Sequence, residues 1–256
     1  MIKFTLESMI KKYYLSNFIE TSIWKILNDK KQLRMAACTP NYVMSVVVEL
    51  NNFEEVPTTE FAVNDTTKLL KMLNALDDDI KLSVKQDNNG KIYNIVINSG
   101  NIEMEYVTAD INVLRANQSV KTISKTNEPP FEVEIILDRD FIDTYIASTT
   151  ALSDSENVVF QMNKDNKIEM VFGHIQGANK SLNTSKIKYL PKTTAGKDIL
   201  TSSLGFNSEY LKQILVANKD AADTIFKLSV TKPMANIQFT NENITATYHV
   251  SGLTVK

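Results

Sequence analysis

Side chains that bind metals or act as nucleophiles are scarce in this 256-residue chain, and those present lie far apart. There are two histidines, His174 and His249, and one cysteine, Cys38. A zinc site needs several such ligands at short spacings, but the chain has neither a Cys-x-x-Cys nor a His-x-x-x-His pair. The sequence therefore predicts no metal site. A single cysteine also excludes an intrachain disulfide.

Clusters of aspartate residues could hold a metal ion or take part in hydrolysis. Residues 77–79 are three consecutive aspartates, and Asp138 and Asp140 flank Arg139. The first cluster falls between a predicted helix and a predicted strand, which favours a solvated turn over a metal site. Asp138 and Asn207 or Ser208 stand where the N-caps of predicted helices belong, as do Asn64 and Asp65. A small hydrolase that uses Asp138, Asp140 or His174 is a hypothesis supported by residue types alone.

Sequence motifs for nucleotide binding and acyl transfer are also absent. The seven glycines form no G-x-G-x-x-G pattern and no phosphate-binding loop, because Gly196-Lys197 is followed by Asp198 and position 191 is Pro191. There is no Gly-x-Ser-x-Gly motif. We therefore predict that the protein is not an enzyme and binds no cofactor.

Composition indicates an ordinary soluble globular protein, with 43% hydrophobic residues, 23% charged residues and a formal charge of −2. The apolar runs are far shorter than a bilayer span, and the first residues lack the apolar core of a signal peptide. These features predict a cytoplasmic protein. The length suits one large or two ordinary domains.

A helix-like segment with adjacent apolar residues recurs four times, at residues 9–14, 69–73, 141–146 and 210–215. At 100° per residue, the apolar positions share one face of each helix, and the next residue points away from it. That residue is a lysine in three copies: Lys11, Lys71 and Lys212. Agreement among three copies favours a functional basic face over an ordinary solvated surface.

Residues that alternate with period two predict strands around these helices. Meanders follow the last three helices, at residues 80–106, 158–172 and 226–250. The first copy is less regular, with strands near residues 33–37 and 42–50. A strand is also expected before each helix, at residues 2–6, 61–63, 133–137 and 204–206. Each unit then reads β-α-β-β-β, which predicts an α+β fold with antiparallel sheets.

Residues 115–130 are polar, end in Pro129-Pro130 and show no clear periodicity, which is typical of a linker. This segment predicts an N-terminal domain at residues 1–114, an interdomain linker at 115–130 and a C-terminal domain at 131–256. Each domain would contain two of the repeated units.

Two domains of two β-α-β-β-β units, with lysine-bearing helices, resemble the DNA sliding clamp family. The resemblance is closest to the clamps of tailed phages and to proliferating cell nuclear antigen. It spans nearly the whole chain and is clearest at residues 61–107, 131–172 and 206–253. It rests on the pattern and order of elements rather than on a diagnostic motif. It implies the clamp fold, with helices lining a central hole and antiparallel sheets outside.

The resemblance also implies a ring of six pseudo-equivalent domains, hence a homotrimer of about 87 kDa for three chains of 28.9 kDa. The residues expected to face double-stranded DNA are Lys11, Lys12, Lys68, Lys71, Arg139, Lys212 and Lys219. The third helix departs from the pattern, because Asp140 and Asp143 occupy the side where lysine is expected. Either Arg139 and nearby loop lysines compensate, or this part of the hole contacts DNA poorly.

The lysine content fits a protein that slides. The chain has 25 lysines and only three arginines, and lysine is a flexible point charge that does not grip phosphate in a fixed fork. A bias in nucleotide composition, which the many asparagines also suggest, explains the same excess without any function.

Family clamps bind partners in a hydrophobic pocket on the outer face, beneath the linker. DNA polymerase, the clamp loader and other replication factors insert short peptides with apolar anchors there. The matching positions in this chain are Cys38, Val43, Ile123, Phe131, Pro233, Tyr248 and Val250. Tyr248 and Val250 could equally be ordinary sheet residues.

The resemblance therefore implies a non-enzymatic processivity factor of DNA replication, located in the host cytoplasm if the protein is viral. The alternative is a structural β-rich virion or scaffold protein with repeated domains. Such a protein would have no reason to carry lysine at one helical position three times.

Overall fold

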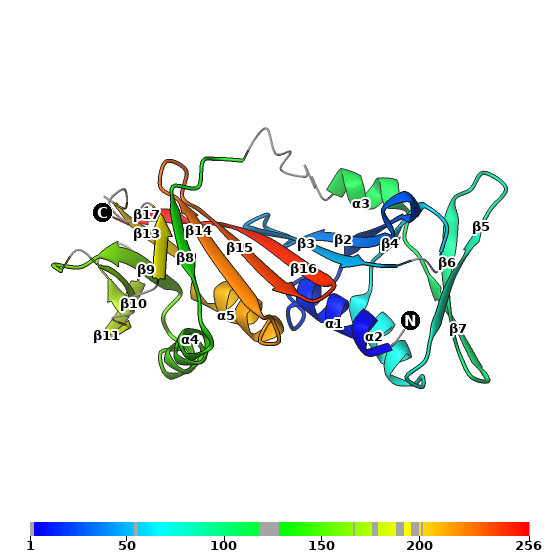
Figure 1. Cartoon of the computed structure of the whole chain (residues 1–256), viewed down its shortest axis with the longest axis horizontal. Coiled ribbons are helices and arrows are strands. Elements are labelled where there is room, and N and C mark those ends of the chain that lie inside the picture. Colours follow the sequence, from blue (N-terminus) through cyan, green and yellow to red (C-terminus); the bar gives the residue numbers. More distant parts are fainter. Residues whose placement is uncertain are drawn as a thin grey trace. The chain divides into compact units, whose positions relative to one another are not determined.

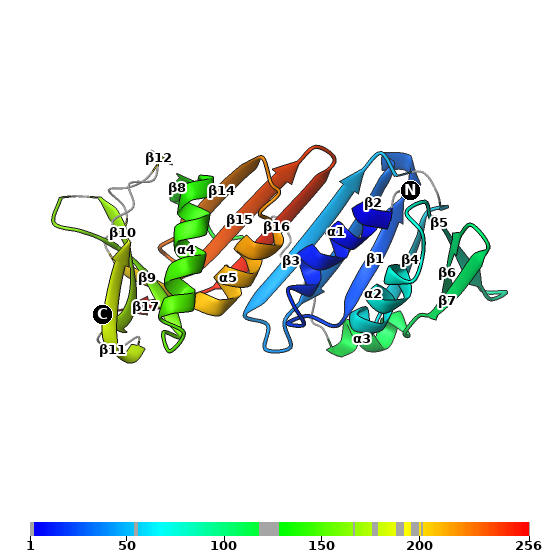
Figure 2. The same ribbon diagram turned by 90° about the horizontal axis from the view of Figure 1, so that it is seen from below.

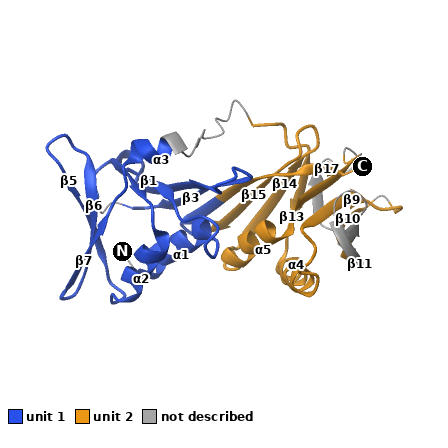
Figure 3. Ribbon diagram, turned by 180° about the vertical axis from the view of Figure 1, so that it is seen from behind, with its two compact units in different colours: residues 1–122, 242–246 blue, residues 123–241, 247–256 orange. Residues whose placement is uncertain are grey.

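The structure is a computed structural model that describes residues 3–53, 56–117, 128–165, 167–175, 179–187, 192–195, 200 and 202–255. The chain divides into two compact units (Figure 3). Unit 1 comprises residues 1–122 and 242–246, and unit 2 comprises residues 123–241 and 247–256. Helices and antiparallel sheets occur in both, so the predicted α+β class is confirmed. No described helix is long and apolar enough to cross a membrane.

Unit 1 contains a sheet with two helices on one face, and a second, smaller sheet. Its elements are α1 (Lys3–Tyr14), β1 (Ser22–Leu27), η1 (Asn28–Lys30), β2 (Gln32–Cys38), β3 (Met44–Asn51), β4 (Thr59–Val63), α2 (Thr66–Asn74), β5 (Lys81–Gln86), β6 (Ile92–Ser99), β7 (Ile102–Val107) and α3 (Ile111–Asn117). The strand orders are β3-β2-β1-β4 and β5-β6-β7. Helices α1 and α2 lie side by side over the same face of the first sheet (Figures 1 and 2).

Unit 2 repeats this plan. Its elements are β8 (Val133–Ile136), α4 (Arg139–Ala151), β9 (Asn157–Met162), β10 (Ile168–Ile175), β11 (Asn179–Ile187), β12 (Lys192–Ala195), β13 (Ser203–Asn207), α5 (Ser208–Ala217), β14 (Asp223–Ser229), β15 (Met234–Asn241), β16 (Ile244–Ser251) and β17 (Leu253–Val255). The strand orders are β12-β8-β14-β15-β16 and β11-β10-β9-β13-β17. Helices α4 and α5 lie side by side on the same face of unit 2 (Figure 2).

Helix caps form where the sequence predicted them. The Asp65 carboxylate accepts a hydrogen bond from the Lys68 backbone N–H at 2.7 Å, and Asp138 accepts one from Phe141 at 2.8 Å. Asn207 does the same for Tyr210 at 2.9 Å. A side-chain oxygen at this position satisfies a backbone donor that the helix leaves unpaired. These caps set the first turns of α2, α4 and α5.

One prediction about the first unit was wrong, and one of its strands was missed. Residues 3–6 begin helix α1 and do not form a strand, because Leu6, Met9, Ile10 and Tyr13 recur at helical spacing and are all buried. Strand β1 was not predicted, because consecutive residues at its start are buried on both faces and hide the alternation.

The chain near the predicted linker begins as a helix. Helix α3 covers residues 111–117, where the sequence predicted a linker from residue 115 onwards. Arg115 of α3 forms an ion pair with Glu60 of β4 at 2.5 Å, and Leu114 is buried. Residues 118–127 lie outside the described part of the chain.

Candidate nucleic-acid interface

Helix α2 presents the clearest basic face in the structure. Leu69 and Leu73 are fully buried, whereas Lys68 and Lys71 on the other side are exposed. Within the described part of the chain, neither lysine has an ion-pair partner. Both ammonium groups are therefore free to meet an anionic partner.

The orientation of α2 is set by polar contacts at its first turn. The Glu20 carboxylate accepts hydrogen bonds from the Thr67 backbone N–H at 3.1 Å and from the Thr67 hydroxyl at 2.6 Å. The Tyr14 hydroxyl of α1 is 2.8 Å from the same Thr67 hydroxyl. An anion at a helix N-terminus is favourable because the backbone N–H groups there are unpaired. These contacts hold α2 against α1.

Helix α1 exposes one of its two predicted lysines. The Lys11 side chain is 58% exposed and pairs with Glu7 at 3.3 Å, one helical turn away. Lys12 is only 2% exposed, so the prediction that it faces DNA is wrong. Lys12 follows Met9 by three residues and shares its flank of the helix, and Met9 is fully buried. Helical position alone did not reveal that this flank is covered.

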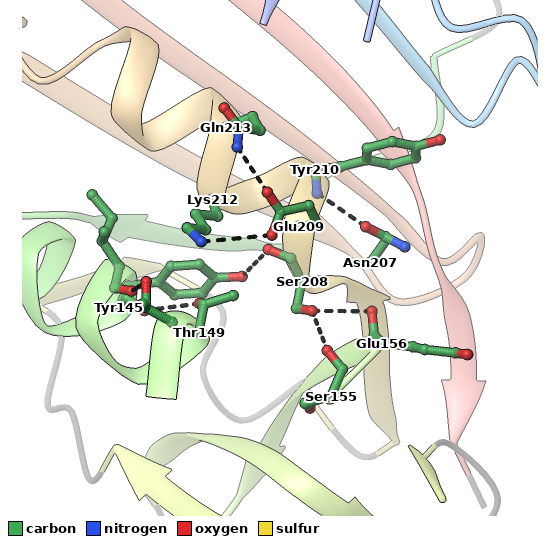
Figure 4. A network of polar contacts seen from close by, with 12 residues as sticks. Tyr145, Thr149, Ser155, Glu156, Asn207, Ser208, Glu209, Tyr210, Lys212 and Gln213 are labelled. Carbon is green, nitrogen blue, oxygen red and sulfur yellow. Dashed lines mark hydrogen bonds and ion pairs between the residues drawn. The ribbon is translucent and has the colours of Figure 1, made fainter. Parts of the chain in front are cut away.

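The predicted cations of unit 2 are all in contact with other groups. The Lys212 side chain is 22% exposed and lies 3.7 Å from Glu209, which also accepts a hydrogen bond from Gln213 at 2.7 Å (Figure 4). Lys219, just after α5, pairs with Asp143 of α4 at 3.1 Å. Arg139 donates to the Lys219 carbonyl oxygen at 3.0 Å.

A buried hydrogen-bond network joins α4 to the start of α5. The Tyr145 hydroxyl donates to the Ser208 carbonyl oxygen at 3.0 Å (Figure 4). The Ser208 hydroxyl in turn donates to the carbonyl oxygens of Ser155 and Glu156. Burial raises the pKa of Tyr145, which keeps the hydroxyl protonated as a donor. The outward faces of α4 and α5 are therefore held in a defined arrangement.

Two residues predicted for the partner pocket belong to the core of unit 2. Tyr248 and Val250 are completely buried, and the Tyr248 hydroxyl accepts a hydrogen bond from the Asn218 side chain at 2.8 Å. Asn218 is the C-cap of α5, so these residues face the helices and not the outer surface. The pocket prediction is wrong for both, because successive strand residues point to opposite faces.

His249, which was not predicted as a pocket residue, points the other way. Its ring lies 6.4 Å from the Phe131 ring, and its Nε2 is 2.8 Å from the Asn236 amide nitrogen and 3.6 Å from Glu128. Burial lowers the pKa of His249, partly opposed by the Glu128 charge. The alternation of β16 separates His249 from Tyr248 and Val250, but it does not say which set faces the helices.

Three more of the predicted pocket residues lie in loops. Phe131 and Pro233 are half-buried, and the Pro233 carbonyl oxygen accepts a hydrogen bond from Gly252 at 2.8 Å. Val43 is half-buried in the loop between β2 and β3. Ile123 lies outside the described residues.

Cys38 lines a cavity of about 370 Å³ in unit 1. The residues around it are Ile19, Glu20, Thr21, Cys38, Thr39, Pro40, Tyr42 and Leu114. Burial raises the pKa of the Cys38 thiol, so it behaves as a small apolar group rather than as a nucleophile. Leu114 comes from α3, an element that the sequence interpretation did not include.

Of the residues considered for catalysis, Asp138 has a structural role. Asp138 caps α4, and the His174 side chain lies outside what the structure describes. Among the described residues, no three histidine, cysteine, aspartate or glutamate side chains are grouped so that they could hold a metal ion.

Comparison with known proteins identifies the fold. No protein-family profile and no curated protein sequence matches the chain. Among solved structures, proliferating cellular nuclear antigen from Entamoeba histolytica aligns with a TM-score of 0.69 and 13% identity, over 98% of this chain and 96% of that one. PCNA from Thermococcus kodakaraensis aligns with a TM-score of 0.65 and 14% identity, over 98% and 97%. The chain therefore has the PCNA-like clamp fold, and the predicted fold is confirmed.

Proposed function

We propose that this protein is a sliding clamp: a ring that encircles duplex DNA and keeps a replicative polymerase on it. The main support is the clamp-like fold along 98% of the chain. The exposed lysines of α1 and α2 add a sequence-independent attraction to the phosphate backbone. Tethering raises the effective concentration of the polymerase at the primer end, so a weak contact becomes persistent.

The ring would be a homotrimer closed by edge strands. In the part of the chain that the structure describes, β7 ends one sheet of unit 1 and β11 ends one sheet of unit 2. An edge strand carries unpaired backbone groups that can pair with another chain. On β7, Val107 is 67% exposed and Ile102 is 41% exposed, so an apolar side chain is exposed on each face of this edge strand. We assign the subunit contact to β7 of one protomer and β11 of the next.

Partner peptides would bind on the outer surface of each unit. In unit 2 the proposed contact residues are Phe131, Pro233 and His249, which replace the buried Tyr248 and Val250. In unit 1 the Cys38 cavity has room for an apolar side chain. The expected partners are a DNA polymerase and a clamp loader.

Native mass and DNA topology test the function together. We expect a mass of about 87 kDa for three chains of 28.9 kDa. Once loaded, the ring should remain on circular duplex DNA in high salt and leave the same DNA after it is linearised. A monomer at micromolar concentration, or equal loss from both DNA forms, would refute the proposal. Assembly into open sheets or shells would instead favour a virion or scaffold protein.

A further inference from the structure

The helices of the two units carry very different charge. In unit 1, α1 has three lysines and one glutamate and α2 has two lysines, which gives a formal charge of +4. In unit 2, α4 has one arginine and two aspartates and α5 has one lysine and one glutamate, which gives −1. Both pairs of helices occupy the corresponding place in their units (Figure 2). The count for unit 1 includes Lys12, which is 2% exposed, and Lys3, which pairs with Asp78 at 3.8 Å.

Three of the five lysines of α1 and α2 are exposed to a ligand. Lys68 and Lys71 are exposed, have no ion-pair partner in the described structure, and lie within one turn of each other on α2. Lys11 adds a third exposed ammonium group, although it shares its charge with Glu7. A lysine that replaces condensed counterions on DNA contributes to binding without reading the base sequence.

Two of the three cations at α4 and α5 pair with carboxylates, and the third, Arg139, donates to the Lys219 carbonyl oxygen at 3.0 Å. Lys219 pairs with Asp143 at 3.1 Å, and Lys212 lies 3.7 Å from Glu209 (Figure 4). Asp140 is exposed on the same helix as Asp143. A paired lysine must leave its carboxylate to meet a phosphate, and the exposed carboxylate then repels that phosphate. The net attraction of this surface for DNA is therefore small.

We infer that the two units divide their tasks on DNA: Lys68 and Lys71 of α2, helped by Lys11, attract the phosphate backbone, whereas α4 and α5 form a neutral surface that lets the duplex pass. This inference rests on the proposed clamp function and adds the distribution of contacts around the ring. A trimer would have three attractive surfaces alternating with three neutral ones. Few phosphate contacts at a time would favour sliding over a tight grip.

Matched double variants test the inference in the complete protein. Lys68→Gln/Lys71→Gln and Lys212→Gln/Lys219→Gln remove the same charge from unit 1 and unit 2. The measurement is equilibrium binding to a short, fluorescently labelled linear duplex over a series of salt concentrations. The unit 1 variant should lose at least about tenfold in affinity at low salt. Its slope of log K against log salt should fall by about 1 to 5, because each lost phosphate contact contributes about 0.9 and a trimer loses six lysines.

The unit 2 variant should bind within about twofold of the unaltered protein, and Asp140→Asn/Asp143→Asn should bind more tightly because it frees Lys219 and removes repulsion. Equal losses from the two lysine variants, or no loss from Lys68→Gln/Lys71→Gln, would overturn the inference. Thermal unfolding and native mass check that each variant still folds and assembles.

If the unaltered ring is not retained on circular DNA, the clamp function itself fails. If the ring is retained but the losses are equal, only the division of tasks fails.

Discussion

Neighbouring residues of β16 have opposite environments. Val250 is fully buried, whereas the His249 side chain contacts Asn236 and Phe131 on the other face. The partner-site proposal depends on this register, because a shift of one residue would exchange the two faces.

The same replacement at both positions measures the register. Val250→Thr places a hydroxyl in the apolar core and should lower the free energy of unfolding by about 1–3 kcal/mol. His249→Thr introduces a β-branched residue on the outer face, where strands favour such residues, and should lower the free energy of unfolding by about 1 kcal/mol or less. Urea denaturation measures both values. A larger loss for His249→Thr than for Val250→Thr would show that the strand faces are reversed.

The lysines at the repeated helical position differ in exposure and in ion-pair partners from one helix to another. Lys71 is exposed and unpaired among the described residues, Lys11 is exposed beside Glu7, and Lys212 is mostly covered beside Glu209. The repeat predicted one role for all three. Local partners, which the repeat does not reveal, decide how much charge each lysine offers to DNA.

At the level of elements, the helix caps show that Asp65 and Asp138 have structural roles. Asp138 was considered as a catalytic residue, but its carboxylate accepts the Phe141 backbone N–H at the start of α4. Asp65 has the equivalent role at α2. A capping carboxylate is held by the backbone, and its position follows from the helix.

Removal of the α4 cap should therefore affect stability and not DNA retention. Asp138→Ala should lower the free energy of unfolding by about 1 kcal/mol, and Asp138→Asn should restore most of the loss because asparagine is also a good N-cap. Denaturant unfolding measures the first effect, and retention on circular DNA measures the second. An unchanged free energy of unfolding in Asp138→Ala would contradict the capping role. If a fully folded Asp138→Asn variant were no longer retained on circular DNA, the carboxylate would have a functional role.

For the whole molecule, the decisive question is whether β7 closes the ring. Val107 on β7 is 67% exposed in the single chain, and Val113 on α3 is 58% exposed. Only the first lies on a strand that we assign to the subunit contact. The two valines therefore form a matched pair of similar exposure.

A charge at the proposed contact should dissociate the trimer. Val107→Lys buries an unpaired charge if a neighbour covers β7, so the native mass should fall from about 87 kDa towards the 28.9 kDa of one chain. Val113→Lys should leave the mass unchanged. Far-ultraviolet circular dichroism confirms that both variants are folded. A trimer that survives Val107→Lys, or dissociates equally in Val113→Lys, would place the contact elsewhere.

The sequence by itself determined the local elements of this protein. Apolar spacing located α2, α4 and α5, side-chain oxygens marked their caps, and period-two runs marked most strands, because these signals depend only on nearby residues. The order of these elements was enough to suggest the clamp fold. Helix α3 and strand β1 were not predicted, since one is short and the other is buried on both faces.

Only the tertiary structure decided which faces are covered and which charges are free. Alternation put Tyr248 and Val250 on one face of β16, but the packing of that face toward α5 made them core residues. Lys219 and Asp143 are 76 residues apart in sequence, and their ion pair exists only because α4 and α5 lie together. Periodicity relates a side chain to its own element, whereas burial and pairing depend on the neighbouring elements that folding brings beside it.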